Sequence, residues 1–162
     1  MTSRDGTTGA SGELDERCVV VGVGASAGGL KALEAFFGAI SAEAGAGHAF
    51  IVVQHLAEDH QSLLPELLQR VAHLQVAPVV DGALVAPGHV YVMPAGVTVS
   101  MNEGRMKLHE RTGPRTTHTP IDDLFRSLAQ EKGRRAVGVI LSGSGRDGTA
   151  GVAAIKAAGG VT

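Results

Sequence analysis

Ser26 lies in a glycine-rich segment, residues 19–30 with the sequence VVVGVGASAGGL, whose residue types could serve two kinds of chemistry. Residues 22–27 fit the G-x-G-x-x-A pattern, in which glycines allow the backbone to approach a bound pyrophosphate. Residues 24–28 fit G-x-S-x-G, in which a sharp strand-to-helix turn presents a serine hydroxyl as a nucleophile. A tight turn without a catalytic role would also require small residues, so the segment alone leaves three interpretations open.

His55 and Asp147 each follow another apolar segment, and with Ser26 they supply the three residue types of a hydrolytic triad. In such a triad the serine attacks a carbonyl carbon while the histidine accepts the serine proton. The aspartate fixes the tautomer of the histidine and stabilises the imidazolium that forms. An aspartate among glycines can also simply close a turn, so the assignment depends on where the fold places the three residues.

Apolar segments that favour strands alternate along the chain with segments that have a helical pattern of apolar residues. The expected strands and helices, in chain order, are 18–24, 29–40, 49–54, 62–72, 136–141 and 149–159. This alternation is typical of βαβ units, and strands that are apolar at nearly every position suit parallel strands covered on both faces. We therefore predict an α/β fold with a doubly wound, mainly parallel sheet and helices on both faces.

The middle of the chain departs from this alternation. Turn signals at residues 94–96 (PAG) and 102–104 (NEG) predict an antiparallel hairpin excursion over about 89–110. After it, Thr119 is a candidate N-cap and Pro120 suits the first helical position, so a helix is expected to begin there.

Ligands of an open parallel sheet bind at the carboxyl ends of its strands, which is where Ser26, His55 and Asp147 are expected to lie. A dinucleotide site would need an acidic residue at the end of the second strand, and residues 44–53 contain none. A P-loop is excluded because no G-K-[ST] follows the glycines. The triad is thus favoured, although its Ser, His, Asp order differs from the Ser, Asp, His order of α/β-hydrolases.

The composition narrows the class of protein further. The 162 residues carry a net charge of −2, no Trp and 3% aromatic residues, which argues against a nucleic-acid surface. No apolar segment approaches the ~20 residues that cross a bilayer, so no membrane insertion is expected. The single cysteine, Cys18, cannot form an internal disulfide, and a cytoplasmic location is the expectation. No two histidines have the spacing of a zinc helix motif, so no metal site is expected.

The sequence also predicts features at the two ends of the chain. Residues 1–17 combine glycine, serine, threonine and charge without an apolar period, so a disordered leader is expected. Residues 18–162 are then expected to form one domain. Residues 158–160 (AGG) fit a helix end, after which Val161 and Thr162 would begin another strand, so the domain is expected to be truncated at its C-terminus.

Five segments of the chain resemble the catalytic domain of the chemotaxis protein-glutamate methylesterases, the CheB family. They are VGVGASAGGLKALEAFF at 21–37, FIVVQHLAEDHQSLLPELLQR at 50–70, GHVYVMPAG at 88–96, HTPIDDLFRSLA at 118–129 and AVGVILSGSGRDGTAGVAAIKAAGG at 136–160. The likeness extends from about Val19 to the last residue. Several motifs in the same order and at the same spacing are far more specific than the serine pattern alone.

The resemblance implies that Ser26 is the nucleophile, His55 the general base and then acid, and Asp147 the residue that orients the imidazole. The implied reaction is hydrolysis of a glutamate γ-methyl ester on the cytoplasmic helices of a methyl-accepting chemoreceptor. The family also includes deamidation of specific receptor glutamines. Neither a metal nor an organic cofactor is implied.

The surroundings of the substrate can be predicted in the same way. The N–H of Ala27, the residue after the nucleophile, is a candidate oxyanion donor, and the resemblance adds the N–H of Ser144. His118 corresponds to a histidine near the site of the family, although a polar residue at a helix entry explains it equally well. Stand-alone members commonly carry Thr at position 27. The Ala form is similar to methylesterase modules of hybrid proteins that also contain a methyltransferase.

Two functions of different classes remain open from the sequence. One is an ester hydrolase that acts on a receptor side chain. The other is a binding or regulatory module that has the same fold and no turnover. The presence of Ser26, His55 and Asp147 together favours the hydrolase, because a module released from catalysis has no physical need for all three.

Overall fold

The computed structural model describes residues 17–55, 63–113, 118–143 and 145–162. The expected leader lies outside the described residues except for Arg17. The elements, in chain order, are β1 (Val19–Ala25), α1 (Leu30–Gly38), α2 (Ala42–Gly45), β2 (His48–Gln54), α3 (Leu64–Gln69), β3 (Gln75–Pro78), β4 (His89–Val92), β5 (Val97–Asn102), β6 (Arg105–Glu110), α4 (Pro120–Lys132), the 3-10 helix η2 (Gly133–Arg135), β7 (Ala136–Ser142) and α5 (Thr149–Ala157).

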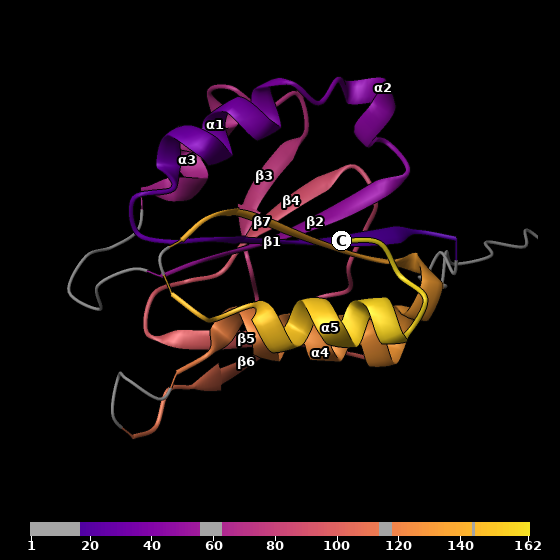
Figure 1. Ribbon diagram of the computed structural model, residues 1–162. Coiled ribbons are helices and arrows are strands. Elements are labelled where there is room, and N and C mark those ends of the chain that lie inside the picture. Colours follow the sequence, from indigo (N-terminus) through magenta and orange to yellow (C-terminus); the bar gives the residue numbers. More distant parts are fainter. Residues whose placement is uncertain (1–16, 56–62, 114–117, 144) are drawn as a thin grey trace, which may run out of the picture.

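The main sheet has five strands in the order β3-β4-β2-β1-β7, and every pairing in it is parallel. Figure 1 shows the layers: α1, α2 and α3 lie on one side of the sheet, and α4, α5 and the β5-β6 hairpin lie on the other. The predicted α/β fold with helices on both faces is confirmed. β1 lies between β2 and β7, so the segments that follow these three strands emerge side by side.

The two faces of the sheet bury separate cores, which explains why its central strands are apolar at nearly every position. Along β1, Val20 belongs to the core under α4 and α5, whereas Val21 and Val23 belong to the core under α1 and α3. Side chains of a strand alternate between its faces, so a strand covered on both sides needs apolar residues in both phases. The continuous apolar runs of the sequence therefore predicted these strands well.

The antiparallel hairpin is present but begins later than expected. Residues 89–92 form β4, a parallel strand of the main sheet, and the hairpin consists of β5 and β6 alone. It forms a sheet of its own and packs on α4 through the buried Val99 and Met101 of β5. The PAG turn at 94–96 therefore connects two different sheets rather than two strands of one hairpin.

Two further boundaries can be compared with the expectations. Val161 makes a single parallel bridge to Val137 of β7, in agreement with the strand expected after residue 160. The helix expected from Thr119 is α4, but the Thr119 side chain caps none of its N–H groups. The cap comes instead from Asp147, as described below.

Candidate active site

Ser26 is the first residue after β1 and lies in the turn that leads into α1. Its N–H donates to the carbonyl of Ser142, the last residue of β7, at 2.9 Å. Its carbonyl accepts from the N–H of Gly29 at 2.9 Å and from the side-chain amide of Gln54, the last residue of β2, at 3.2 Å. The backbone of Ser26 is thus tied to both strands that flank β1, which gives the hydroxyl a defined position.

The glycines around Ser26 are explained by close packing. A Cβ added to Gly22 would lie 2.7 Å from Cε1 of Phe125, and one added to Gly24 would lie 2.8 Å from Cγ2 of Ile121. Both contacts are with α4, so these two glycines allow that helix to lie directly on β1. A Cβ on Gly29 would lie 2.6 Å from Oγ of Ser142. Helix packing accounts for the glycines of the pyrophosphate pattern without a phosphate.

His55 follows β2 directly, and its backbone N–H donates to the Ala25 carbonyl of β1 at 3.2 Å. Nε2 of its ring lies 2.8 Å from Oδ2 of Asp147. In the neutral ring Nε2 then carries the hydrogen and donates a hydrogen bond to the carboxylate, which leaves Nδ1 as the basic nitrogen. The His55 side chain is 40% exposed and that of Asp147 only 10%, so the ring can meet a substrate while the carboxylate stays sheltered.

Asp147 lies in the loop between β7 and α5, and its carboxylate also caps α4. Oδ2 accepts from the N–H of Ile121 at 3.0 Å, and Oδ1 accepts from the N–H of Asp122 at 2.9 Å. Burial raises the pKa of Asp147, but the hydrogen bonds from His55 and from these two N–H groups outweigh it and hold the pKa below its ordinary value. The carboxylate is therefore ionised at neutral pH and fixed by three donors.

The sheet register explains why these side chains converge. Ala25 is paired with Gln54 on one side and with Ser142 on the other. Ser26 and His55 therefore leave neighbouring strands at the same level, and the loop that begins after Ser142 carries Asp147 to the His55 ring. Three segments that are distant in the sequence meet at the carboxyl end of the sheet, as expected.

The hydroxyl of Ser26 has a partner that the sequence did not reveal. Its Oγ lies 3.4 Å from Oγ of Ser142, and among the described residues this is its hydrogen-bond contact. Within the described residues no hydrogen bond joins the Ser26 hydroxyl to the His55 ring. Catalytic hydrogen bonds are often long or misaligned without substrate, so this geometry is compatible with a triad.

Comparison with known proteins places this chain in a family. The family model of the CheB methylesterases matches residues 21–162. The chain belongs to the CheB methylesterase family. It is 40% identical over 158 residues to "Protein-glutamate methylesterase/protein-glutamine glutaminase 6" of Anaeromyxobacter dehalogenans and 34% identical over 158 residues to the protein-glutamate methylesterase/protein-glutamine glutaminase of Salmonella typhi. These alignments cover 93% and 94% of this chain but only 44% of each relative, so the chain spans less than half of their length.

A solved structure agrees with this assignment. The crystal structure of the CheB methylesterase catalytic domain of Thermotoga maritima superposes with a TM-score of 0.77 and 26% sequence identity. The match covers 88% of this chain and 77% of that one. The α/β fold is therefore the fold of a CheB catalytic domain.

The structure gives different information on the three other residues that were predicted to lie near the substrate of this CheB family chain. Ala27 is exposed in the turn directly after Ser26. Ser144 lies outside the described residues. Nε2 of His118 lies 3.2 Å from the carbonyl of Gly113, and no contact joins His118 to the triad residues in the described part of the chain. This contact agrees with both interpretations of His118, a polar residue at a helix entry and a residue near the substrate.

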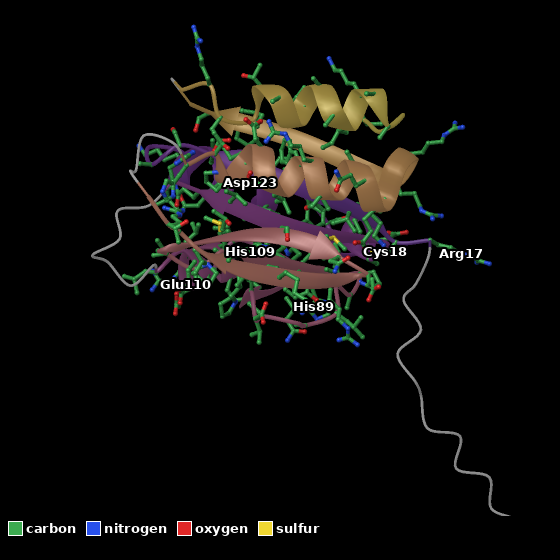
Figure 2. The ribbon with its side chains drawn as sticks, turned by 90° about the horizontal axis from the view of Figure 1, so that it is seen from below. Arg17, Cys18, His89, His109, Glu110 and Asp123 are labelled. Carbon is green, nitrogen blue, oxygen red and sulfur yellow. The ribbon has the colours of Figure 1, made fainter. Side chains whose placement is uncertain are left out.

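Two polar hollows lie at opposite ends of α4. One of about 240 Å³ is lined by Thr98, Glu110, Arg111, Thr112, His118, Thr119 and Asp123. In Figure 2, Glu110 and Asp123 lie on the opposite side of the view from Cys18. Thr119 and Asp123 place this hollow at the start of α4, the helix end that Asp147 caps. A larger hollow of about 540 Å³ lies at the other end of α4, beside Gly104 and Arg135. The smaller hollow thus lies at the end of α4 that holds Asp147, and the larger one does not.

Sequence reasoning missed three polar residues that support the site. Gln54 and Ser142 end the strands on either side of Ser26, and their position at strand ends was the available signal. Asp122 is buried, with 6% of its surface exposed, and nothing in its sequence context distinguishes it from an ordinary first-turn acid of a helix.

Within the described segments no three acidic, histidine or cysteine side chains are grouped to hold a metal ion. Nor does any helix among those residues have the length and apolarity needed to span a membrane.

Proposed function

We propose that this chain is the catalytic domain of a protein-glutamate methylesterase, and that Ser26, His55 and Asp147 are its triad. The observation that carries the proposal is the 2.8 Å contact between His55 Nε2 and the carboxylate of Asp147, made beside the nucleophile turn of Ser26. Membership of the CheB methylesterase family supports the choice of reaction. The substrate is a glutamate γ-methyl ester on the cytoplasmic helices of a methyl-accepting chemoreceptor.

The residues would divide the reaction as follows. Nδ1 of His55 accepts the proton of Ser26 as Oγ attacks the ester carbonyl carbon, and the carbonyl oxygen becomes an oxyanion. The imidazolium then donates that proton to the leaving methoxide, and methanol departs from the acyl-enzyme. Water attacks the acyl-enzyme by the reverse sequence, which releases glutamate and restores Ser26. With a receptor glutamine as substrate the leaving group is ammonia.

The oxyanion needs donors that already point to its position. The N–H groups of Ala27 and Ser144 are the proposed pair, and each donor of this kind contributes about 10²- to 10³-fold to kcat. His118 is proposed to lie beside the bound substrate at the polar hollow of about 240 Å³. A receptor segment that carries the ester would then lie across the carboxyl end of the sheet.

The proposal also covers the setting of the domain. Residues 18–162 would form the methylesterase unit, and it would act in the cytoplasm, where the receptor helices are. Since the Ala27 form is similar to modules of hybrid proteins with a methyltransferase, a methyltransferase module is the second proposed partner. The receptor is the first.

Methanol release from a methylated chemoreceptor cytoplasmic fragment tests the proposal. Ser26→Ala and His55→Ala should abolish release, and Asp147→Asn should lower kcat by about 10⁴-fold because the wrong histidine tautomer is then favoured. His73→Ala, which alters an exposed histidine before β3, is the matched control and should behave as the parent chain. No release from the folded parent chain would reject the esterase and favour the binding or regulatory module.

A further inference from the structure

The Asp122 carboxylate is buried at the start of α4, and the reaction described above does not use it. Its Oδ1 accepts from the N–H of Gly148 at 3.0 Å and from the N–H of Gly151 at 2.6 Å. These are N–H groups at the N-terminus of α5, which have no partners within their own helix. Asp122 therefore caps α5 from the neighbouring helix, and Gly148 is the residue next to Asp147.

Asp122 and Asp147 cap each other's helices. Asp147 accepts from the N–H groups of Ile121 and Asp122 at the start of α4, while Asp122 accepts from two N–H groups at the start of α5. The backbone of Asp122 donates to Asp147, and the backbone beside Asp147 donates to Asp122. The two segments are thus tied in both directions, so a displacement of either backbone segment relative to the other strains the bonds at both carboxylates.

Two glycines make this exchange sterically feasible. A Cβ on Gly151 would lie 2.5 Å from Cβ of Phe125 and 3.1 Å from Cα of Asp122, so only glycine lets α5 approach α4 this closely. Gly148 has a φ of 99°, in the left-handed region that L side chains rarely adopt. The close approach brings the N–H of Gly151 to the Asp122 carboxylate.

We propose that Asp122 is a positioning residue for the reaction, which holds the Asp147 carboxylate against His55 by fixing the start of α5 to the start of α4. This inference rests on the proposed triad. Asp122 is too buried to touch a substrate, so its loss should lower kcat and leave KM unchanged. Small displacements of catalytic groups can cost about 10²-fold, and a loss of this size is expected for Asp122→Ala.

Four variants test this role. Asp122→Ala removes the Oδ1 atom that accepts both bonds, whereas Asp122→Asn keeps an oxygen at the Oδ1 position and should restore most of the rate. Ser127→Ala is the matched control, since it removes two hydrogen bonds of the same helix, to Met101 N–H and to the Leu124 carbonyl, away from Asp147. If Asp122→Ala does not fold, Asp122→Glu takes its place, because it keeps the charge but displaces the oxygens by one methylene.

A double-mutant cycle separates positioning from simple loss of stability. If Asp122 acts through Asp147, Asp122→Ala should cost little or nothing further in kcat once Asp147 is alanine. Costs that multiply in the double variant would overturn the proposal. Equal kcat for Asp122→Ala and Ser127→Ala, or parent-like kcat for both Asp122→Asn and Asp122→Glu, would also overturn it.

Two readouts do not depend on the receptor substrate. One is the rate at which a fluorophosphonate probe labels Ser26, and the other is the proton NMR signal of the His55 N–H that donates to Asp147. Asp122→Ala should slow the labelling and weaken or shift the signal, and Asp122→Asn should restore both. A parent chain that is labelled but releases no methanol would reject the esterase and leave the role of Asp122 testable by these signals. An unchanged signal and labelling rate in Asp122→Ala would reject that role alone.

Discussion

The Asp147 carboxylate receives three hydrogen bonds, from His55 and from two N–H groups at the start of α4. One group thus orients the imidazole and completes a helix. A carboxylate held by backbone N–H groups keeps its charge even when buried, and this charge is what an imidazolium needs beside it. At the scale of the residue, the proposed catalysis and the capping of α4 therefore depend on the same two oxygens.

A pH-dependent contribution to stability follows from the pKa of Asp147. Because this pKa is lower in the folded chain than in the unfolded chain, ionised Asp147 stabilises the fold above the ordinary carboxyl range. That contribution is lost as the pH falls through the folded pKa. The free energy of unfolding in urea should therefore differ most between the parent and Asp147→Asn near neutral pH, and the difference should shrink on acidification.

Asp123 is the matched control for this experiment, since it is the neighbour of Asp122 and its pKa shifts in the opposite direction. Burial raises the pKa of Asp123, and Arg126, whose Nη1 lies 4.0 Å from Oδ1, offsets this only in part. Its ionisation therefore opposes folding at neutral pH, so Asp123→Asn should be at least as stable as the parent there. A difference for Asp147→Asn that does not change with pH would contradict the account of Asp147.

At the scale of the element, the sequence predicted the strands and the strand ends well and the helix caps poorly. β1, β2 and β7 are visible as apolar runs because both faces of the sheet are covered. Ser26 and His55 follow from where those runs stop. The exchange between Asp122 and Asp147 joins residues that are 25 positions apart, so no local pattern announces it. Thr119 was predicted as the cap of α4 because sequence rules consider only neighbouring residues.

The α4-α5 contact gives a prediction at this scale. Gly151→Ala places a Cβ within 2.5 Å of Cβ of Phe125, which forces the two helices apart. We expect a loss of about 1–3 kcal/mol in the free energy of unfolding, typical of an overpacked core, and a lower kcat because the bonds of Asp122 are stretched. Gly47→Ala, where an added Cβ meets nothing within 4 Å, is the control for urea unfolding and methanol release. Equal stability of the two variants would contradict the close packing.

At the scale of the whole molecule, the sheet separates two cores with different relations to the site. The core under α1 and α3 contains Leu68, and the core under α4 and α5 contains Leu128; both side chains are fully buried. α4 also bears the N–H groups that hold Asp147. The two leucines are therefore matched in burial, while only the core under α4 and α5 packs against the helix that holds Asp147 beside His55.

One leucine-to-alanine substitution in each core tests whether the two cores differ in their effect on the site. Leu68→Ala and Leu128→Ala should each cost about 2–5 kcal/mol in the free energy of unfolding, because each leaves a cavity of similar size. At a temperature where both variants remain folded, Leu128→Ala should also lower kcat, because a loosened α4 shifts the Asp147 carboxylate relative to His55. Leu68→Ala should keep the parent kcat. If Leu68→Ala lowered kcat as much as Leu128→Ala does, the site would depend on the compactness of the whole fold, and the layer of α4 and α5 would have no special part in holding it.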